Sequence, residues 1–322
     1  ESYWQAVLQQ PDTAIASMDA ALAAGKSLEG HSAGARGKKL AAYTVTGVSS
    51  CHEPILPVEV LERLRLGLYV MIREGSIRRD LQVISSIKDT GIDHRRLILV
   101  TDGIEPTDLI ENGYMEYVVQ KAVDCGFDPV KAIQMATLNV AEHFGLSDHI
   151  GGIAPGRHAD LVLIPDERTI TADIVVSDGR VIAEQGIIAV RPRQHRFTEA
   201  SLHTVELPRP VTPEDFTIRS SPLKKRATVR VIDMATDLVT REMHMEIDVT
   251  NGTIPTSPDI GLLKAAAVDR RFAAGKVFTG LIKGFGLTSG AFACSAAWDT
   301  SDIVVIGAAD ADIEIVRVPG AF

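Results

Sequence analysis

Residues 69–103, "YVMIREGSIRRDLQVISSIKDTGIDHRRLILVTDG", contain two short apolar runs that each end in polar residues. The first run, 69–72, leads into Arg73, and the second, 96–100, leads into Asp102. Helical sequence separates them. Short apolar runs that alternate with helical stretches are typical of parallel strands joined by helices. This stretch therefore predicts βα units.

The same alternation extends over residues 1–146 and predicts four such units. In a (β/α)₈ barrel the functional side chains lie at the carboxyl ends of the strands, so the polar residues after each run are candidate site residues. The strands are expected at 26–31, 48–52, 69–72 and 96–100, and the helices at 37–43, 57–68, 108–125 and 129–144.

Beyond residue 150 the pattern changes to shorter strands and more turns. Residues 151–186 are punctuated by Gly, Pro and an Asp178-Gly179 pair, which predicts a small antiparallel sheet with a hairpin turn. Residues 191–226 are rich in Pro, Arg, Ser and His and are expected to be irregular. Residues 227–316 predict a further α/β unit with strands at 227–233, 244–250 and 303–306.

The composition excludes several classes of protein. The 322 residues include 33 Lys and Arg against 42 Asp and Glu, a net charge of −9 that disfavours a nucleic-acid partner. No apolar run approaches the roughly 20 residues of a membrane-spanning helix, so we expect no membrane partner. The three cysteines are widely spaced and odd in number, which indicates a reducing compartment, by default the cytoplasm.

Four residues at predicted strand ends have the chemistry of metal ligands. They are Glu1, His31, His52 and Asp102. Each alone is equally typical of a strand cap or a turn. Together they offer the imidazoles and carboxylates that bind divalent ions. A bound ion lowers the pKa of a water molecule, and a free carboxylate can accept its proton, so the pattern indicates hydrolytic chemistry.

Other polar residues lie beside these candidates. Arg73, Glu74 and Ser76 could contact a substrate at the mouth of their strand, or could form structural ion pairs. Cys51 adjoins His52, but neighbouring strand residues point to opposite faces, so we expect Cys51 in the core.

Several strings together resemble the adenine deaminase branch of the amidohydrolase superfamily. The resemblance covers nearly the whole chain and continues into "GFGLTSGAFACSAAWDTSDIVVIG" near the end. The strings that carry it earlier in the chain are "GHSAG", "SSCHEPI", "VMIREGSIRRDL", "TDGIEP", "AIQMATLNVAEHFGL" and "GGIAPGRHADLVLI".

The resemblance implies a fold of three parts. Residues 1–147 would form the C-terminal half of a metal-dependent hydrolase (β/α)₈ TIM barrel, strands 4 to 8. Residues 148–190 would form a small β-sandwich piece. Residues 191–322 would form the C-terminal α/β domain of adenine deaminases. The first barrel strand, with a His-x-His metal-binding pair, would lie upstream of Glu1, so the chain alone is expected to be inactive.

The resemblance also implies roles for the site residues. Glu1 would bridge two metal ions, His31 and His52 would bind metal, and Asp102 would bind metal and move a proton. Glu53 would handle a proton of a ring nitrogen. The implied ions are Mn²⁺ or Fe²⁺, with Zn²⁺ equally suited to the ligands. The implied reaction converts adenine to hypoxanthine and ammonia, in a homo-oligomeric enzyme of purine metabolism.

Two differences from the family pattern leave alternatives open. Gly103 stands where the family has a second Asp, and residues 298–302, "WDTSD", replace His-Asp-Ser-His-Asn. The chain could therefore act on another cyclic amidine or amide. It could also be a non-catalytic homologue that serves as a binding subunit.

Overall fold

The computed structural model describes residues 2–202, 204–205, 207–235, 240–297, 300 and 302–315. The chain divides into two compact units, residues 1–193 and 194–322. Some residues discussed in the sequence analysis lie outside the described residues, namely Glu1, Trp298, Asp299 and Ser301.

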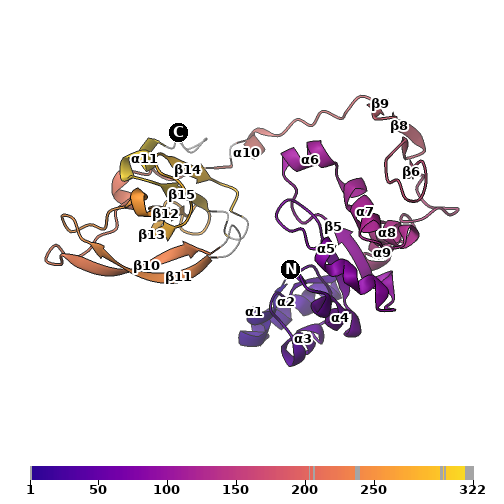
Figure 1. The fold of residues 1–322 in the computed structure, drawn as a ribbon, viewed down its shortest axis with the longest axis horizontal. Coiled ribbons are helices and arrows are strands. Elements are labelled where there is room, and N and C mark those ends of the chain that lie inside the picture. Colours follow the sequence, from indigo (N-terminus) through magenta and orange to yellow (C-terminus); the bar gives the residue numbers. More distant parts are fainter. Residues whose placement is uncertain are drawn as a thin grey trace. The chain divides into compact units, whose positions relative to one another are not determined.

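The first unit is built on a five-stranded parallel sheet (Figure 1). Each strand pairs in parallel with the next along the chain, as the alternating pattern predicts. The strands are β1 (Ser2–Tyr3), β2 (Leu28–His31), β3 (Val48–Cys51), β4 (Tyr69–Arg73) and β5 (Leu97–Val100). Because neighbours are parallel, all five carboxyl ends lie along one edge of the sheet.

Helices connect these strands. Four of the helices begin at a proline, which is well suited to a first helical position because it has no N–H to leave unpaired. The helices are α1 (Trp4–Gln9), α2 (Pro11–Ala23), α3 (Gly37–Thr44), α4 (Pro57–Arg65), α5 (Leu81–Ile84), η1 (Ser85–Asp89), η2 (His94–Arg96), α6 (Pro106–Asn112), α7 (Met115–Asp124), α8 (Pro129–Ala136) and α9 (Leu138–His143).

The two long helices expected at 108–125 and 129–144 each form as two shorter helices, so those predictions were wrong in length. Gly113, with a φ of 93°, ends α6 in a conformation that side-chain-bearing residues rarely adopt. Thr137 leaves the helical region between α8 and α9, and its hydroxyl donates to the Ile133 carbonyl oxygen at 2.7 Å. Helical periodicity alone does not report these breaks.

Two apolar clusters hold the helices to the sheet. One lies between β4 and β5 and the helices α4, α5, α7 and α8. The other packs α1, α2 and α3 against β2 and β3, around the fully buried Leu40 and Tyr43. Burial of each large apolar side chain contributes about 1.5–3 kcal/mol, so these clusters dominate the stability of the unit.

A partly buried ion pair joins α9 to the start of β2. His143 Nε2 lies 3.1 Å from the Glu29 carboxylate, and the Ser50 hydroxyl donates to the same carboxylate. Burial raises the pKa of Glu29, but the hydrogen bonds from His143 and Ser50 outweigh it and hold this pKa below its ordinary value. The pair therefore favours the charged carboxylate in the folded state.

A small antiparallel sheet completes the first unit. Asp178 and Gly179 have φ values of 50° and 74°, as a type I′ turn requires, which confirms the predicted hairpin. Gln120 on α7 hydrogen-bonds to the backbone of Arg168 and Ile170 and so attaches this segment to the helices. The strands are β6 (Leu161–Leu163), β7 (Ile174–Ser177), β8 (Arg180–Glu184) and β9 (Ile187–Ile188), in that order.

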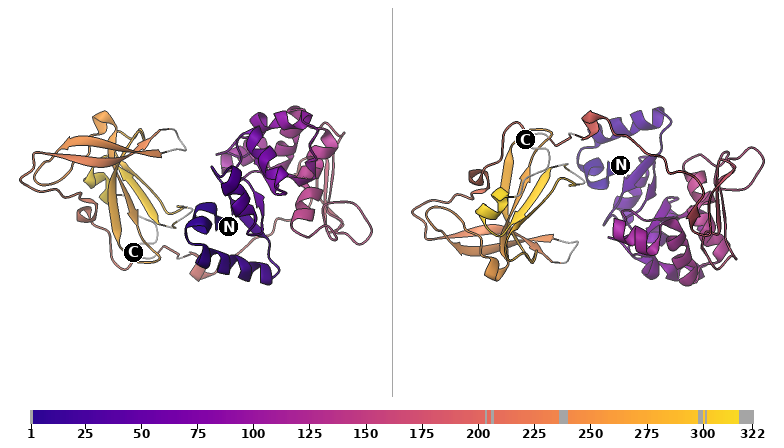
Figure 2. Two further views of the ribbon diagram at one scale, coloured as in Figure 1. Left: turned by 90° about the horizontal axis from the view of Figure 1, so that it is seen from below. Right: turned by 90° about the horizontal axis from the view of Figure 1, so that it is seen from above.

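The second unit is a six-stranded mixed sheet (Figure 2). β10 and β13 are parallel, whereas the other neighbours are antiparallel. The strand order is β11 (Thr240–Asp248), β10 (Arg226–Met234), β13 (Val277–Lys283), β12 (Leu262–Val268), β15 (Ile303–Gly307) and β14 (Ala291–Cys294). Its described helices are the short α10 (Glu199–Leu202), η3 (Pro213–Phe216), η4 (Pro258–Ile260) and α11 (Asp310–Ile315). Strands thus dominate this unit more than its predicted α/β pattern indicates.

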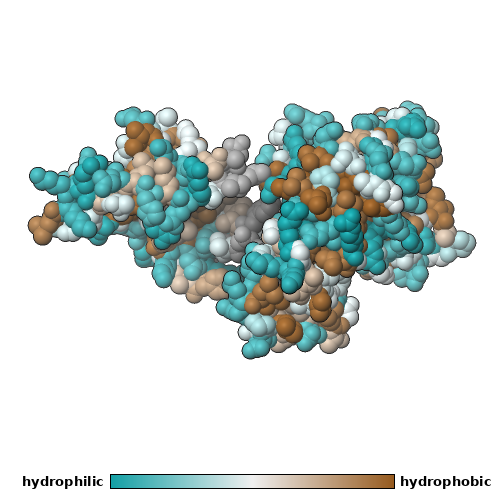
Figure 3. Space-filling model, turned by 60° about the horizontal axis from the view of Figure 1, so that its bottom comes forward, coloured by the Kyte–Doolittle hydropathy of each residue, from teal (hydrophilic) through white to brown (hydrophobic). Residues whose placement is uncertain are grey.

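Among the described residues no helix has both the length and the apolar content needed to cross a membrane. Figure 3 shows polar and apolar side chains intermingled over the visible surface.

The Glu29–His143 pair predicts a pH-dependent stability of α9. Because the folded-state pKa of Glu29 is lowered, its contribution is present above the ordinary pKa of 4.5 and is lost as the pH falls through the folded-state value. We expect Glu29→Gln to reduce the hydrogen-exchange protection of residues 138–143 at pH 7. Below the folded-state pKa the difference from the wild type should vanish.

The exposed Glu167→Gln serves as the matched control and should leave this protection unchanged at every pH. Equal protection of wild type and Glu29→Gln at pH 7 would show that the ion pair does not hold α9.

Candidate metal centre

The carboxyl edge of the parallel sheet gathers four of the candidate residues. His31 is the last residue of β2, and His52 follows β3 directly. Arg73 ends β4, and Asp102 lies two residues beyond β5. Parallel pairing therefore brings together side chains that lie up to 71 positions apart in the sequence.

Two histidines and one carboxylate form a compact cluster at this edge. Glu53 Oε1 lies 3.0 Å from His31 Nδ1 and 3.4 Å from His52 Nε2. The two imidazole rings meet edge to face with 4.6 Å between their centroids. One ligand atom from each of the three residues lies within 4.8 Å of the others, a spacing at which a single metal ion could bind all three.

The cluster is sheltered from solvent without being sealed. The side chains of His31, His52 and Glu53 are 21%, 13% and 14% exposed. Burial lowers the pKa of His52, and the adjacent His31 lowers it further against the opposing pull of Glu53. His52 is therefore neutral at pH 7, which is the form that binds metal.

Arg73 connects this cluster to Asp102. Its Nη1 atom donates to Asp102 Oδ2 at 3.0 Å and lies 3.8 Å from Glu53 Oε1. On its other side, Nε lies 3.5 Å from Asp80 Oδ2. The guanidinium is 5% exposed and is thus surrounded by three carboxylates in a largely buried setting. Asp102 has a φ of 49°, so its backbone turns sharply to present the side chain there.

Glu74 and Ser76, the other two candidate substrate residues, support the loop in this structure. The Glu74 carboxylate is buried, pairs with Lys121 on α7 and accepts the Leu81 N–H at 3.2 Å. Ser76 Oγ accepts the Glu105 N–H at 2.7 Å. Both contacts join the loop after β4 to neighbouring segments, and neither brings the side chain to the histidine cluster.

Two residues of this region are not evident from sequence. Asp80 faces Arg73, although Asp80 lies seven positions later in the sequence. Burial raises the pKa of Asp80, and the charge of Arg73 opposes this rise. Arg63 on α4 is buried and donates to the carbonyl oxygen of Ser32, the residue after His31. Both residue types usually lie on the surface, so sequence offers no signal that they turn inward.

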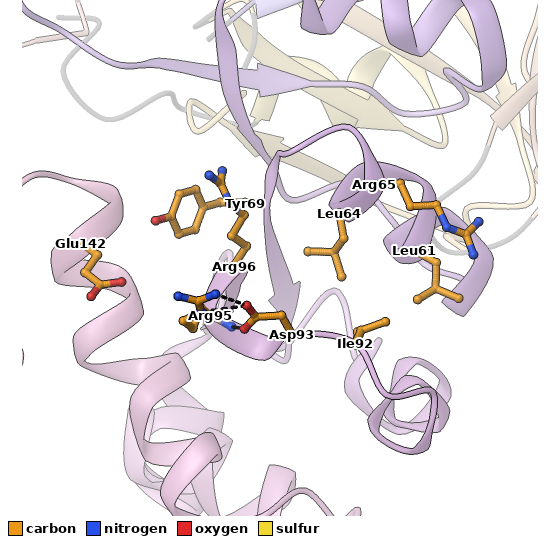
Figure 4. A pocket seen from close by; sticks show the side chains of 9 residues that line it. All are labelled: Leu61, Leu64, Arg65, Tyr69, Ile92, Asp93, Arg95, Arg96 and Glu142. Carbon is orange, nitrogen blue, oxygen red and sulfur yellow. Dashed lines mark hydrogen bonds and ion pairs between the residues drawn. The ribbon is translucent and has the colours of Figure 1, made fainter.

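A separate cavity of about 500 Å³ lies at the other end of β4 (Figure 4). Tyr69 lines it and is the first residue of β4, whereas Arg73 is the last. The cavity therefore opens toward the amino ends of the strands, away from the histidine cluster. Its lining residues are Leu61, Leu64, Arg65, Tyr69, Ile92, Asp93, Arg95, Arg96 and Glu142.

The donor set at the carboxyl edge suits a divalent ion. Imidazole nitrogens and a carboxylate oxygen are the ligands of zinc and of neighbouring transition metals. Asp102, 3.0 Å from Arg73, offers a further carboxylate beside the cluster. The arrangement can hold an ion and keep a second carboxylate available for proton transfer.

Comparison with known proteins gives two family matches. Residues 4–189 match the amidohydrolase family, and residues 237–317 match the adenine deaminase C-terminal domain. The first match includes His31, His52, Arg73 and Asp102, so the whole carboxyl-edge cluster lies within it.

Similar curated proteins carry the name adenine deaminase. The protein from Moorella thermoacetica is 38% identical over 299 residues, which cover 92% of this chain and 50% of that protein. The protein from Clostridium botulinum strain 657 is 33% identical over 312 residues, 96% of this chain and 52% of that protein. The protein from Cenarchaeum symbiosum is 37% identical over 297 residues, 91% of this chain and 48% of that protein. The chain thus spans about half the length of these relatives.

The cluster predicts metal binding that depends on its histidines. We expect His52→Ala to weaken Mn²⁺ or Zn²⁺ binding by the 322-residue chain at least tenfold, because one of three clustered donors is lost. Isothermal titration at pH 7 measures the affinity. His244→Ala is the matched control, since His244 is exposed in the second unit. Equal losses in the two variants would contradict a site at the cluster.

The backbone at Gly75, beside the site, is packed too closely to accept a side chain. A Cβ atom on Gly75 would lie 2.1 Å from the Thr101 carbonyl oxygen and 2.4 Å from that of Gly103. We therefore expect Gly75→Ala to destabilise the first unit by at least about 2 kcal/mol, because backbone must move. Thermal unfolding checks this.

Gly280→Ala provides the comparison, since its Cβ would meet Phe278 at an ordinary 3.5 Å. An unchanged unfolding transition in Gly75→Ala would contradict the tight packing of these two loops.

Proposed function

Because the chain belongs to the amidohydrolase family, we propose that it carries the metal-binding and catalytic portion of a hydrolytic adenine deaminase. The observation that carries the proposal is the cluster of His31, His52 and Glu53 at the carboxyl edge of a parallel sheet. The match of residues 237–317 and the names of the similar proteins support adenine as the substrate.

His31 and His52 would hold a divalent ion through their ring nitrogens, with Glu53 close enough to orient both rings. Glu1 and Asp102 complete the ligand set that the family resemblance implies, and we propose a binuclear centre of Mn²⁺ or Fe²⁺, with Zn²⁺ as the other candidate. When bound, such an ion lowers the pKa of a water molecule toward ~7 and makes it a nucleophile at neutral pH.

Asp102 would accept the proton that the attacking water releases. Its carboxylate is 34% exposed and thus reachable, and it accepts a hydrogen bond from Arg73 Nη1 at 3.0 Å. The water oxygen would form a bond to C6 of adenine while N1 takes up a proton from Glu53, which lies beside both histidines. Asp102 would then pass its proton to the amino group, so that the C6–N6 bond breaks and ammonia leaves. The C6 hydroxyl would return a proton to Glu53 and become the carbonyl group of hypoxanthine.

Arg73 would hold both carboxylates in place. One Nη1 atom lies between Asp102 and Glu53, and Asp80 faces its Nε atom, so the guanidinium orients two groups that must move protons. We further propose that Arg73 contacts the nucleobase, whereas Glu74 and Ser76 act through the loop that they support.

The same proposal includes predictions of the compartment, the oligomeric state and the domain boundaries. The three cysteines are unpaired, as expected for a cytoplasmic protein. We expect homo-oligomers because β1 and β5 each have one neighbour in the described sheet, and open strand edges favour association. Domain boundaries at 147/148 and 190/191 also stay predictions.

Activity tests the proposal directly. The chain is combined with the part of the Moorella thermoacetica relative that it does not match, and Mn²⁺ is added. We expect ammonia and hypoxanthine from adenine, with at least a 100-fold loss of kcat in Asp102→Asn because the proton acceptor is removed. The exposed Asp248→Asn is the matched control and should retain activity.

A panel of purines, pyrimidines and cyclic amides separates the other candidates. Turnover of a cyclic amide but no purine would contradict adenine and support the second amidohydrolase function. No turnover of any compound, despite bound metal, would contradict catalysis and favour a binding subunit.

A further inference from the structure

Arg63 is a buried cation that has no acidic partner among the described residues. It is 1% exposed, and in the part of the chain that the structure describes no carboxylate lies within ion-pair distance of it. Burying a charge without an ion pair is costly unless hydrogen bonds replace its water shell. Arg63 therefore needs a dense set of acceptors, and the structure provides one.

The acceptors belong to the loop that follows His31. Arg63 Nη2 donates to the Ser32 carbonyl oxygen at 2.7 Å and to the Ala35 carbonyl oxygen at 3.3 Å. Its Nε and Nη2 atoms both donate to Ser32 Oγ, at 3.1 and 3.0 Å. Nη1 donates to the Glu59 carbonyl oxygen of its own helix at 3.2 Å. One planar guanidinium thus clamps the loop onto α4.

The same network continues to the strand that precedes His52. Ser32 Oγ lies 2.8 Å from Cys51 Sγ. Because Ser32 Oγ already accepts two N–H groups from Arg63, its own proton is directed to the sulfur. Cys51 Sγ also accepts the Glu53 N–H at 3.3 Å. His31 and His52 are therefore adjacent in sequence to Ser32 and Cys51, and the Glu53 N–H donates to Cys51. All three cluster residues are thus linked to this network.

Little freedom is left in this network. Ser32 and Cys51 are both 0% exposed, so neither can exchange its partner for water. A lysine at position 63 would keep the charge, but its single ammonium group cannot reproduce the planar fork that reaches Ser32 and Ala35 together. The geometry thus depends on arginine and not on charge alone.

We propose that Arg63 is a positioning residue of the metal centre, which sets the distance between the His31 and His52 imidazoles through Ser32 and Cys51. The expected effect on metal affinity rests on the proposed function. The distance between the two imidazoles is a property of the chain without metal and is tested separately.

Nuclear magnetic resonance of the histidine rings tests the spacing without metal. Long-range ¹H–¹⁵N spectra of the 322-residue chain are compared for wild type, Arg63→Lys and Ser32→Ala. We expect the ring signals of His31 and His52 to shift in both variants, while those of His158 and His244 stay in place. Arg65→Lys, two positions along the same helix and outside the network, is the matched control and should shift neither cluster histidine.

The second variant is included because Arg63→Lys could fail to fold. If Arg63→Lys loses the wild-type signals of the buried His94, the milder Ser32→Ala decides the question, because it removes one hydroxyl and keeps the arginine. Unshifted His31 and His52 signals in a folded variant would overturn the proposal. A purely structural role of Arg63 would lower the melting temperature but would leave these two signals unchanged.

Cobalt titration then measures the consequence for the metal. We expect Arg63→Lys and Ser32→Ala to bind Co²⁺ about 10–100-fold more weakly than wild type, the loss typical of residues that orient metal ligands, with altered visible absorption bands. Wild-type affinity in both variants would overturn the proposal. If the wild-type chain itself fails to bind Co²⁺, the proposed function is contradicted, while the ring spectra still decide the role of Arg63.

Discussion

Parallel pairing of β2, β3, β4 and β5 is the constraint on which the candidate site depends. Parallel strands place all their carboxyl ends at one edge, so His31, His52, Arg73 and Asp102 meet although they come from four separate βα units. The helices and the two apolar clusters stabilise that sheet.

Two buried arginines at this edge differ in their hydrogen-bond partners. Arg73 is surrounded by the carboxylates of Glu53, Asp80 and Asp102, so its charge is compensated and keeps acidic groups in reach of the cluster. Arg63 faces carbonyl and hydroxyl oxygens, so its fork geometry matters more than its charge. We propose that one cation organises the side chains that would handle protons and that the other organises the backbone that carries the candidate ligands.

The family match agrees with this geometry. The amidohydrolase match spans β2 to β5 of the parallel sheet and the small antiparallel sheet, and the adenine deaminase C-terminal match falls within the second unit. The two matches therefore follow the division of the molecule into two units. The catalytic proposal rests on the first unit alone, since every residue of the cluster belongs to it.

The sequence by itself determined the alternation of strands and helices in the first unit, the hairpin at Asp178-Gly179 and the polar residues at the strand ends. Those features are local, because they follow from apolar periodicity and from the turn preferences of Asp and Gly. Only the tertiary structure decided that Glu74 turns away to Lys121, that Asp80 turns inward to Arg73, and that Arg63 is buried against the loop that follows His31. The orientation of a charged side chain depends on which distant segment packs against it, and a single sequence carries no signal of that contact.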